Sequence, residues 1–298
     1  MRSLKKKIEL SRILELIEIN KNSEEMIAIL DNYHSMPKSH VIGMTGPPGV
    51  GKSSLIDKLI RDFRKKKKSV GVIAVDPSSH NSGGALLGDR TRFQLDPNDE
   101  GVFVRSMAAK DYLGGISELT FPSMIVMRSK FDYIIIETVG VGQSETSIKD
   151  MVDTVVLCVQ PGGGDTIQFM KSGVFEIPDI ITITKSDIEN LSNLTYSDLL
   201  GSKNYFEKIN DWPINIIPTS SHKNIGLEDL LKEIEKRWSW LKKEKRLKKR
   251  RLNQDLEWIK KSLLTEFGVS GLNKLRNKYD YKGTPFSSLL KLKKKIKI

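Results

Sequence analysis

The stretch GPPGVGKSS, residues 46 to 54, decides how the rest of this chain can fold. It follows the apolar run HVIGMT at 40–45 and matches the phosphate-binding loop pattern G-x-x-x-x-G-K-[ST]. Such a loop wraps backbone N–H groups around phosphate oxygens at the start of a helix, with a lysine charge and a hydroxyl for Mg²⁺ beside them. We therefore expect Lys52 to serve catalysis and Ser53 to be a metal ligand. The predicted nucleotide-binding residues of this loop are Gly46, Pro48, Gly49, Val50, Gly51, Lys52, Ser53 and Ser54.

Short apolar runs alternate with helical stretches along the middle of the chain. Several of these runs are apolar at consecutive positions, which is typical of parallel strands covered on both faces. The alternation predicts an α/β fold with a doubly wound, mostly parallel sheet and right-handed crossovers, which binds its ligand at the carboxyl ends of the strands. The predicted strands are 40–45, 69–76, 101–106, 131–138, 153–160, 179–185 and 214–220.

Helical sequence flanks this region on both sides. Residues 4–33 have apolar residues at helical spacing, and a break at 20–23 predicts two short helices with Ser23 as the second N-cap. Near the other end, a long charged helical pattern is interrupted at Gly268 and Gly271, and the last residues are expected to fray. The predicted domains are an N-terminal helical extension at 1–38, a P-loop domain at 39–240 and a basic helical arm at 241–298.

The charge of the chain is concentrated in this arm. The formal net charge is +12, yet residues 241–298 contain 19 Lys or Arg and 5 Asp or Glu, a net of +14. A basic segment can bind nucleic acid or anionic lipid. The densest basic run, 242–251, has no interleaved aromatic residues for base stacking, which favours a solvated lysine-rich helical face over a nucleic-acid site.

Composition indicates a cytoplasmic protein without a membrane span. No apolar run approaches the roughly 20 residues that a bilayer requires. The basic N-terminus lacks the apolar core and cleavage site of a signal peptide and has the pattern of an amphipathic helix. The single cysteine, Cys158, lies in the apolar run TVVLCVQ, so we expect a reducing compartment and an inert core thiol.

A second motif ends the predicted strand 131–138. In FDYIIIETVG, a buried strand ends in the acid Glu137, and Gly140 follows three residues later. The carboxylate can reach Mg²⁺, often through water, and the glycine N–H can contact a γ-phosphate. The pair resembles the D-x-x-G element of G proteins with Glu in place of Asp. We expect Glu137 to be a metal ligand and catalytic residue and Gly140 to bind the nucleotide.

A third motif, TKSD at 184–187, falls where the base of a bound nucleotide would lie. It resembles the guanine-reading pattern N-K-x-D, in which the acid accepts two hydrogen bonds that adenine cannot donate. Lys185 and Asp187 are therefore predicted to bind the base, whereas Thr184 departs from the usual Asn and leaves guanine selectivity open. The later stretch PTSS at 218–221 predicts base contacts from Ser220 and Ser221.

Two further stretches add polar candidates to the strand ends. Asp76 closes the second strand and Asp89 follows in a glycine-rich stretch, so either could hold Mg²⁺ or position the attacking water. Asp165, Gln168 and Lys171 recur at three-residue spacing on one helix face, and by themselves they favour a capped, solvated helix start.

In this order, the segments VDPSSHNSGGALLGDRTR, ETVGVGQSE, PGGGDTIQ with MKSG, and TKSD resemble the MeaB/ArgK (MMAA-like) family of P-loop GTPases over roughly residues 25–260. The resemblance implies a GTPase that binds GTP, GDP and Mg²⁺ and acts as a chaperone of an adenosylcobalamin-dependent mutase of the methylmalonyl-CoA type, controlling cofactor loading and protection. It also implies switch segments at 76–92, 137–146 and 165–171. The arm, including RLNQDLEW at 251–258, would form a homodimer.

Other functions remain open at this point. The same core could serve an ATP- or GTP-dependent kinase or ATPase linked to lysine/arginine/ornithine transport, although no lid or separate substrate domain is evident. A metal-insertion GTPase would usually need a Cys/His cluster, and the chain has one cysteine and four histidines. Nucleic-acid binding through the arm is disfavoured for the reason given above.

Overall fold

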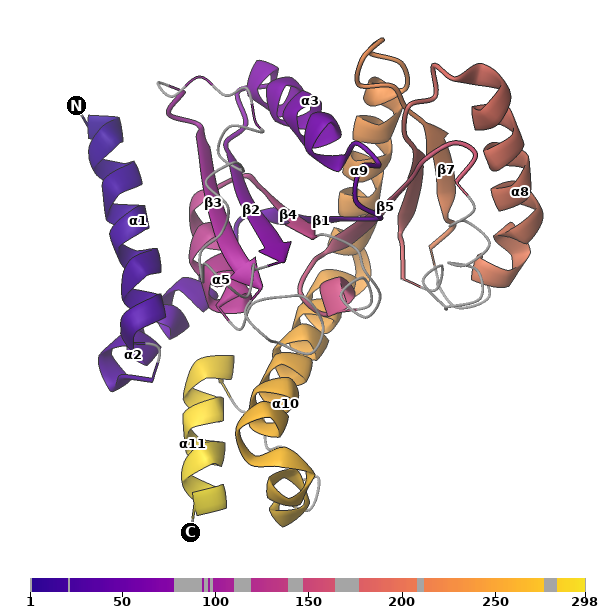
Figure 1. Cartoon of the computed structure of the whole chain (residues 1–298). Coiled ribbons are helices and arrows are strands. Elements are labelled where there is room, and N and C mark those ends of the chain that lie inside the picture. The colour runs from indigo at the N-terminus through magenta and orange to yellow at the C-terminus, as the bar shows by residue number, and fades with distance from the viewer. Residues whose placement is uncertain are drawn as a thin grey trace.

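The computed structural model of this chain describes residues 2–20, 22–77, 93, 96, 99–109, 119–138, 147–163, 177–207, 212–275 and 283–297 (Figure 1). Its centre is a seven-stranded sheet with the order β3-β2-β4-β1-β5-β6-β7, in which all neighbouring strands are parallel. The predicted α/β sheet is therefore confirmed. The strands are β1 His40–Thr45, β2 Val70–Pro77, β3 Val102–Ala109, β4 Tyr133–Thr138, β5 Thr154–Val159, β6 Ile180–Ile183 and β7 Asn215–Pro218.

Strand β1 lies in the middle of the sheet and is buried at all six positions. It pairs with β4 on one side and β5 on the other, so that Gly43 lies beside Ile136 and Val155. Because parallel strands end at the same edge, the loop after β1 lies next to the ends of β4 and β5. The pairing thus explains why motifs far apart in the chain converge.

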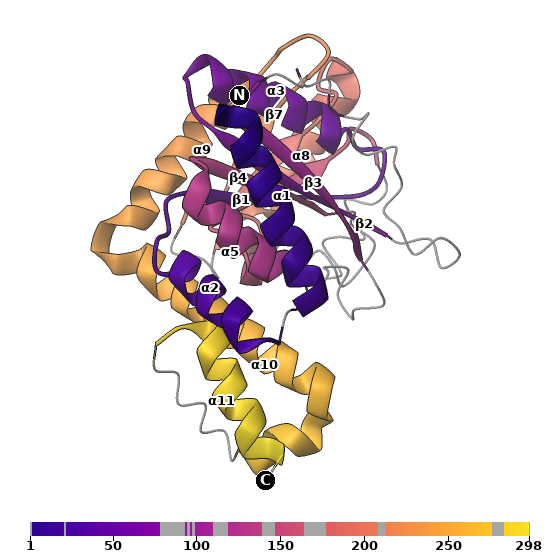
Figure 2. The ribbon, with the colours of Figure 1, turned by 90° about the vertical axis from the view of Figure 1, so that its left-hand side faces the viewer.

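Helices cover both faces of the sheet, as expected for a doubly wound fold. Helices α3 and α9 pack on one face, where their apolar residues join Val156 and Cys158 of β5 in one core. Helix α5 covers the other face with α1 and α2, and α8 packs there against Leu157 and Val159 (Figures 1 and 2). These helices are α3 Lys52–Lys65, α5 Thr120–Lys130, α8 Glu189–Glu207 and α9 Leu227–Lys242, with a short 3₁₀ turn η1 at Ile148–Asp150.

The N-terminal extension forms the two predicted helices, α1 Arg2–Asn20 and α2 Glu24–His34. Ser23 is the N-cap of α2, since its hydroxyl accepts a hydrogen bond from the Met26 N–H at 3.2 Å. A serine oxygen here satisfies one of the N–H groups that a helix start leaves unpaired. The prediction of a break and a cap at this position is confirmed.

The C-terminal segment consists of the 3₁₀ turn η3 Lys243–Lys245 and the helices α10 Arg246–Lys274 and α11 Pro285–Lys297. The predicted interruption is at Gly268, whose φ of 64° and ψ of −171° break the helical geometry, whereas Gly271 is helical. The expectation that the last residues fray is wrong. Helix α11 folds back onto α10 and α2 because it buries Phe286, Leu289, Leu292 and Ile296 there.

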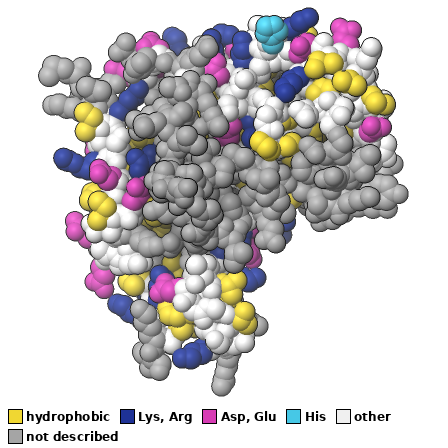
Figure 3. Space-filling model, in the orientation of Figure 1, with side chains coloured by type: hydrophobic (Ala, Val, Ile, Leu, Met, Phe, Trp, Pro, Cys, Tyr) yellow, Lys and Arg dark blue, Asp and Glu magenta, His cyan; other side chains and the backbone are white. Residues whose placement is uncertain are grey.

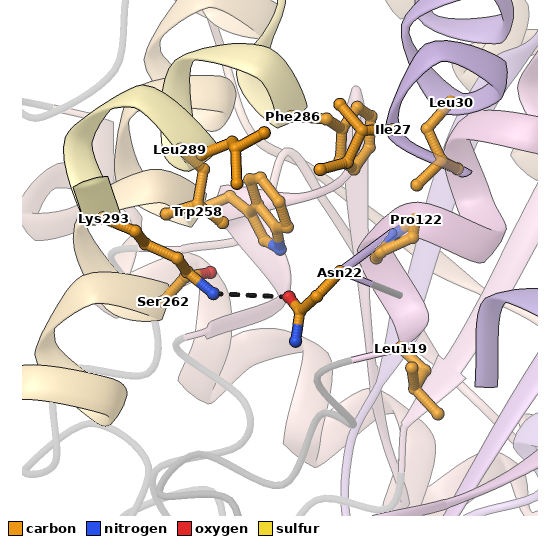
Figure 4. Close-up of a pocket in the computed structure, with 11 residues that line it drawn as sticks. Asn22, Ile27, Leu30, Leu119, Pro122, Trp258, Ser262, Phe286, Leu289 and Lys293 are labelled. Carbon is orange, nitrogen blue, oxygen red and sulfur yellow. Dashed lines mark hydrogen bonds between the residues drawn. The ribbon is translucent and has the colours of Figure 1, made fainter. Parts of the chain in front are cut away.

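Aromatic stacking joins this segment to the sheet domain. The Trp258 ring stacks on Phe121 of α5 with 4.9 Å between ring centroids and meets Phe286 edge-on at 5.0 Å. Beside these rings, residues in and next to α2, α5, α10 and α11 line a mainly apolar, partly open pocket of about 40 Å³ (Figure 4). At its rim, Lys293 Nζ donates to Asn22 Oδ1 at 3.5 Å. The two terminal extensions thus pack against each other in the same chain.

The lysines of the basic run 242–251 are exposed, as expected for a solvated lysine-rich face, whereas two arginines at its end are partly buried. Arg251 donates to the buried carboxylate of Asp153 at 2.7 and 2.9 Å, and Asp153 also accepts from the Val41 N–H. Arg250 donates to the Val152 carbonyl oxygen at 3.0 Å. These bonds hold α10 against the amino ends of β1 and β5. On the face in Figure 3, the Lys and Arg side chains lie among Asp and Glu rather than in one block.

Two further sequence expectations concern the core and the membrane. Cys158 is fully buried, and burial raises the pKa of its thiol to about 12, so the thiol stays protonated and unreactive as predicted. Among the described residues, no helix is long and apolar enough to cross a membrane. The cytoplasmic location stays a prediction.

Candidate nucleotide-binding site

The phosphate-binding loop connects β1 to α3, as the motif predicts. Gly46 has a φ of 141°, and a Cβ atom there would lie 2.2 Å from the Cys158 carbonyl oxygen, so only glycine fits. Gly49 and Gly51 have φ values of 74° and 98°, in the left-handed region that favours glycine. The loop therefore delivers the chain into α3 with backbone N–H groups at the helix start, where anions bind.

Lys52, the first residue of α3, is buried within the loop. Its ammonium donates hydrogen bonds to the carbonyl oxygens of Gly46 at 2.7 Å and Pro47 at 2.8 Å. These bonds hold the positive charge at the concave side of the loop. The arrangement can therefore neutralise phosphate groups cradled by the same backbone.

Ser53 and Glu137 meet although 84 positions separate them in the chain. The Ser53 hydroxyl donates to Glu137 Oε1 at 2.8 Å, because Met44 of β1 pairs with Glu137 of β4 and places the two ends side by side. Glu137 is buried. A hydroxyl and a carboxylate are hard oxygen ligands of the kind that Mg²⁺ prefers, so this pair fits the metal that the motifs imply. Within the described ranges, no cluster of three or more His, Cys, Asp or Glu could hold a metal ion.

The structure describes only part of the predicted phosphate side. The backbone of Asp76 lies in β2, one residue beyond the Val75 position that pairs with Thr138 of β4, which places it near the end of Glu137's strand. Its side chain lies outside the description. The remaining predicted residues of this side and of the signalling segment fall outside the described residues altogether: Asp89, Gly140, Asp165, Gln168 and Lys171.

On the opposite side of the loop, the end of β6 is tied directly to the phosphate-binding loop. The buried Thr184 hydroxyl donates to the Val50 carbonyl oxygen at 2.6 Å and lies 3.0 Å from that of Val159. Lys185, with a φ of 51°, extends its ammonium to the Gly49 carbonyl oxygen at 2.9 Å. Thr184 therefore makes a supporting hydrogen bond to the loop from the position that Asn holds in the N-K-x-D pattern.

The half-buried Asp187 follows at the end of this segment. Hydrogen bonding to Ser220, followed by its own backbone N–H and the charges of Lys223 and His222, lowers the pKa of Asp187. The group is thus ionised at neutral pH and accepts hydrogen bonds only. Ser220 is itself held by paired backbone hydrogen bonds with Ile225. A rigid turn therefore presents the carboxylate and the serine loop together.

These elements enclose a cleft of about 370 Å³, within the size range of small-molecule sites. One wall is the first turns of α3, and the other consists of the ends of β6 and β7. Sequence reasoning missed Asp57, Lys58 and His222 in this lining, although Asp57 and Lys58 follow Ser54 at the spacing of one helix face. The residues that line the cleft are Val50, Gly51, Ser54, Asp57, Lys58, Thr184, Lys185, Asp187, Ser220, Ser221 and His222.

Comparison with known proteins extends the sequence resemblance. Residues 10–270 match the sequence model of the family described as methylmalonyl-CoA mutase-associated GTPase MeaB. A Pyrococcus horikoshii protein that carries a GTPase name is 40% identical over 255 residues, which cover 84% of this chain and 80% of that protein. The GTPase ArgK of Escherichia coli is 34% identical over 224 residues, 74% of this chain and 68% of the relative.

A solved structure shares the fold. The crystal structure described as a LAO/AO transport system kinase superposes with a TM-score of 0.67 and 22% sequence identity, covering 97% of this chain and 93% of that one. At this identity the likeness concerns architecture, and it extends over the helical extensions as well as the sheet.

Proposed function

Because the chain belongs to the MeaB family of methylmalonyl-CoA mutase-associated GTPases, we propose that it is a GTP-dependent chaperone of an adenosylcobalamin-dependent acyl-CoA mutase. The chain is a P-loop GTPase and binds guanine nucleotides, as its family does. The proposal adds that its nucleotide state controls cofactor loading and protection of a mutase of the methylmalonyl-CoA type. The observation that carries it is the family match along residues 10–270.

We assign different roles in phosphate and metal binding to the residues on the phosphate side of the site. Lys52 would stabilise the charge that develops on the phosphate groups, since its ammonium already lies within the loop. Ser53 and Glu137 would hold Mg²⁺ together with oxygen ligands from Asp76 or Asp89. When bound, the metal neutralises phosphate charge. Asp76 would orient the attacking water, and Gly140 would contact the γ-phosphate.

The opposite side supports recognition of guanine. Asp187 would accept hydrogen bonds from the two N–H donors on the base, which adenine does not present in this arrangement. Its lowered pKa keeps it an acceptor at neutral pH. Lys185 would lie over the base, and Ser220 and Ser221 would contact its other edge. Thr184 holds this half of the site against the phosphate-binding loop.

The switch proposal rests on where three segments begin. The segments at 76–92, 137–146 and 165–171 follow or include the ends of β2, β4 and β5. Strands β4 and β5 flank β1, and β2 pairs with β4, so the three strands that precede these segments in the chain all end at the edge of the sheet that carries the phosphate-binding loop. Loss of the γ-phosphate would release their order. Asp165, Gln168 and Lys171 would then signal the nucleotide state to the mutase.

We divide the chain into an N-terminal helical extension at 1–38, a P-loop domain at 39–240 and a C-terminal helical arm at 241–298. The arm is proposed to form a homodimer. Helix α10 exposes the apolar side chains Leu252, Leu264 and Val269, which are 41%, 42% and 65% exposed. Singly exposed apolar side chains are common on monomers, so the dimer proposal rests mainly on the family resemblance of the arm. Because Asp153 and Asp179 engage Arg251 and Arg250, less of the basic run is available to nucleic acid.

The alternative is an ATP- or GTP-dependent kinase or ATPase linked to lysine/arginine/ornithine transport, which matches the name of the solved structure, a LAO/AO transport system kinase. That description belongs to the other protein, and the likeness concerns fold. The two functions differ in what receives the terminal phosphate: water in a GTPase switch and a substrate hydroxyl or side chain in a kinase.

The decisive experiment is nucleotide turnover by the full chain with GTP or ATP, alone and with a purified adenosylcobalamin-dependent acyl-CoA mutase. We expect GTP-selective turnover that rises when the mutase is added. Lys171→Ala should leave the basal rate nearly intact and reduce the stimulation. Equal use of ATP, or no response to the mutase, would contradict the proposed chaperone and favour a search for a phosphoryl acceptor.

A further inference from the structure

We propose that Asp57 binds the ribose hydroxyls of the nucleotide and makes this GTPase selective for ribonucleotides over deoxyribonucleotides. Asp57 lies in the second turn of α3 and lines the 370 Å³ cleft together with Ser54 and Lys58. The apolar residues of α3, including Leu55, Leu59 and Phe63, face the core instead. The helix thus turns a polar face with a carboxylate toward the ligand.

The burial and hydrogen bonding of the Asp57 carboxylate indicate that one of its oxygens lacks a hydrogen-bond donor. Asp57 is 9% exposed, and its Oδ2 pairs with the guanidinium of Arg61 at 3.0 Å. Its other oxygen, Oδ1, is buried, and no hydrogen bond reaches it from any described residue. A buried acceptor without a donor is costly, so a ligand that supplies an O–H or N–H group there gains affinity.

The proposed placement of the nucleotide leaves one part of the ligand for Asp57. The phosphates are repelled by a carboxylate and have no donor to offer at neutral pH. The base donors are assigned to Asp187, on the opposite wall of the cleft. The ribose joins the two, so it crosses the wall formed by Ser54, Asp57 and Lys58. Its vicinal hydroxyls are O–H donors of the kind that Oδ1 lacks.

Specificity follows from the same chemistry. A site built to accept a hydrogen bond from a substrate hydroxyl rejects the analogue without it, because the buried acceptor is then left unpaired. A hydrogen bond to a charged group corresponds to about a tenfold or larger change in affinity. This inference rests on the proposed orientation of the nucleotide, with phosphates at the loop and base at Asp187.

The test is calorimetric binding of GDP, 2′-deoxy-GDP and 3′-deoxy-GDP to the full chain. We expect the wild type to bind GDP about tenfold more tightly than at least one deoxynucleotide. Asp57→Ala should weaken GDP to the affinity of that deoxynucleotide while leaving the deoxynucleotide unchanged. Asp57→Asn, which preserves volume and one acceptor, should fall between. The control Asp62→Asn alters an acid of the same helix that pairs with Lys65 outside the cleft, and it should behave as the wild type.

The outcomes separate this inference from the proposed guanine site. If Asp57→Ala discriminates between ribose and deoxyribose as strongly as the wild type, or if the wild type does not discriminate, the role of Asp57 is wrong. GDP and ADP are compared in the same variants. If Asp57→Ala loses ribose discrimination but keeps its preference for GDP over ADP, the role of Asp57 is supported. If the wild type shows no preference for GDP over ADP, the base-reading proposal is wrong, and the ribose discrimination of wild type and Asp57→Ala alone decides the role of Asp57.

Discussion

The Thr184 hydroxyl donates to the Val50 carbonyl oxygen at 2.6 Å, across 134 positions of the chain. The bond joins the end of β6, which carries Lys185 and Asp187, to the loop that cradles phosphate. Lys185 reinforces the joint through the Gly49 carbonyl oxygen. These two hydrogen bonds therefore fix the position of the base-binding half of the site relative to the phosphate-binding half, in addition to the strand pairing of the sheet.

Removing this hydroxyl should loosen both halves together. We expect Thr184→Val to lower the free energy of unfolding by about 1–3 kcal/mol, because the Val50 carbonyl oxygen loses this donor, whereas the Val159 carbonyl oxygen keeps the Thr184 N–H at 2.8 Å. GDP affinity should fall by about tenfold for the same reason. Urea denaturation and calorimetric titration measure the two effects. Thr184→Ser, which keeps the hydroxyl, is the matched control, and an equal loss in both variants would assign the effect to the methyl group instead.

Asp187→Asn should change which base the site prefers. The amide offers one donor and one acceptor where the carboxylate offers two acceptors, so it no longer matches the two N–H groups of guanine. We expect GDP affinity to fall by about a hundredfold and xanthosine diphosphate to bind more tightly than GDP. Competition binding measures the ratio. Asp198→Asn, at an exposed position of α8, is the control. An unchanged ratio in Asp187→Asn would remove this residue from base recognition.

The buried ion pair of Asp153 and Arg251 should carry much of the attachment of α10. Arg251→Ala leaves the Asp153 carboxylate, 1% exposed in its side chain, without its cation, so we expect a loss of about 3–5 kcal/mol in the free energy of unfolding at pH 7. Urea denaturation measures the change. Lys248→Ala, at an exposed position of the same helix, should change little. A similar stability for both variants would show that the pair only balances its own desolvation.

The same pair predicts how stability depends on pH. Burial by itself would raise the pKa of Asp153, but the charge and hydrogen bonds of Arg251 outweigh it and lower that pKa. The stabilisation is therefore fully present above the unfolded value of about 3.9 and is lost as pH falls below it toward the folded pKa. We expect the stability difference between wild type and Arg251→Ala to shrink as pH is lowered through this window. A constant difference would contradict the assignment to Asp153.

Phe286 should decide whether α11 stays docked. Its ring is 4% exposed and packs on Trp258 and Phe121. Phe286→Ala should lower the free energy of unfolding by about 3–5 kcal/mol or, if α11 detaches and unfolds alone, make the backbone at its lysines susceptible to trypsin. Thermal unfolding and limited proteolysis distinguish these results. Leu194→Ala, at a position of α8 that is 58% exposed, is the control. Wild-type behaviour in both assays would show that the helix docks without this ring.

The sequence by itself determined the features that neighbouring residues encode. The glycines of 46–51, the hydrophobic runs and the Ser23 cap act over a few residues, through backbone sterics, strand burial and hydrogen bonds to adjacent N–H groups. The parallel sheet, the phosphate-binding loop and the two N-terminal helices were predictable for that reason. The family resemblance depends on the same contiguous segments and was confirmed over residues 10–270.

Only the tertiary structure decided which distant groups face one another. No local pattern indicates that Arg251 pairs with Asp153, that the last helix packs its apolar face against α2 and α10, or that one Asp57 oxygen lacks a donor. Each depends on the order of strands in the sheet and on where α3, α9 and α10 lie across it. Buried charges and polar atoms gain or lose their free energy from partners that are remote in sequence, so their roles emerge only when the chain is packed.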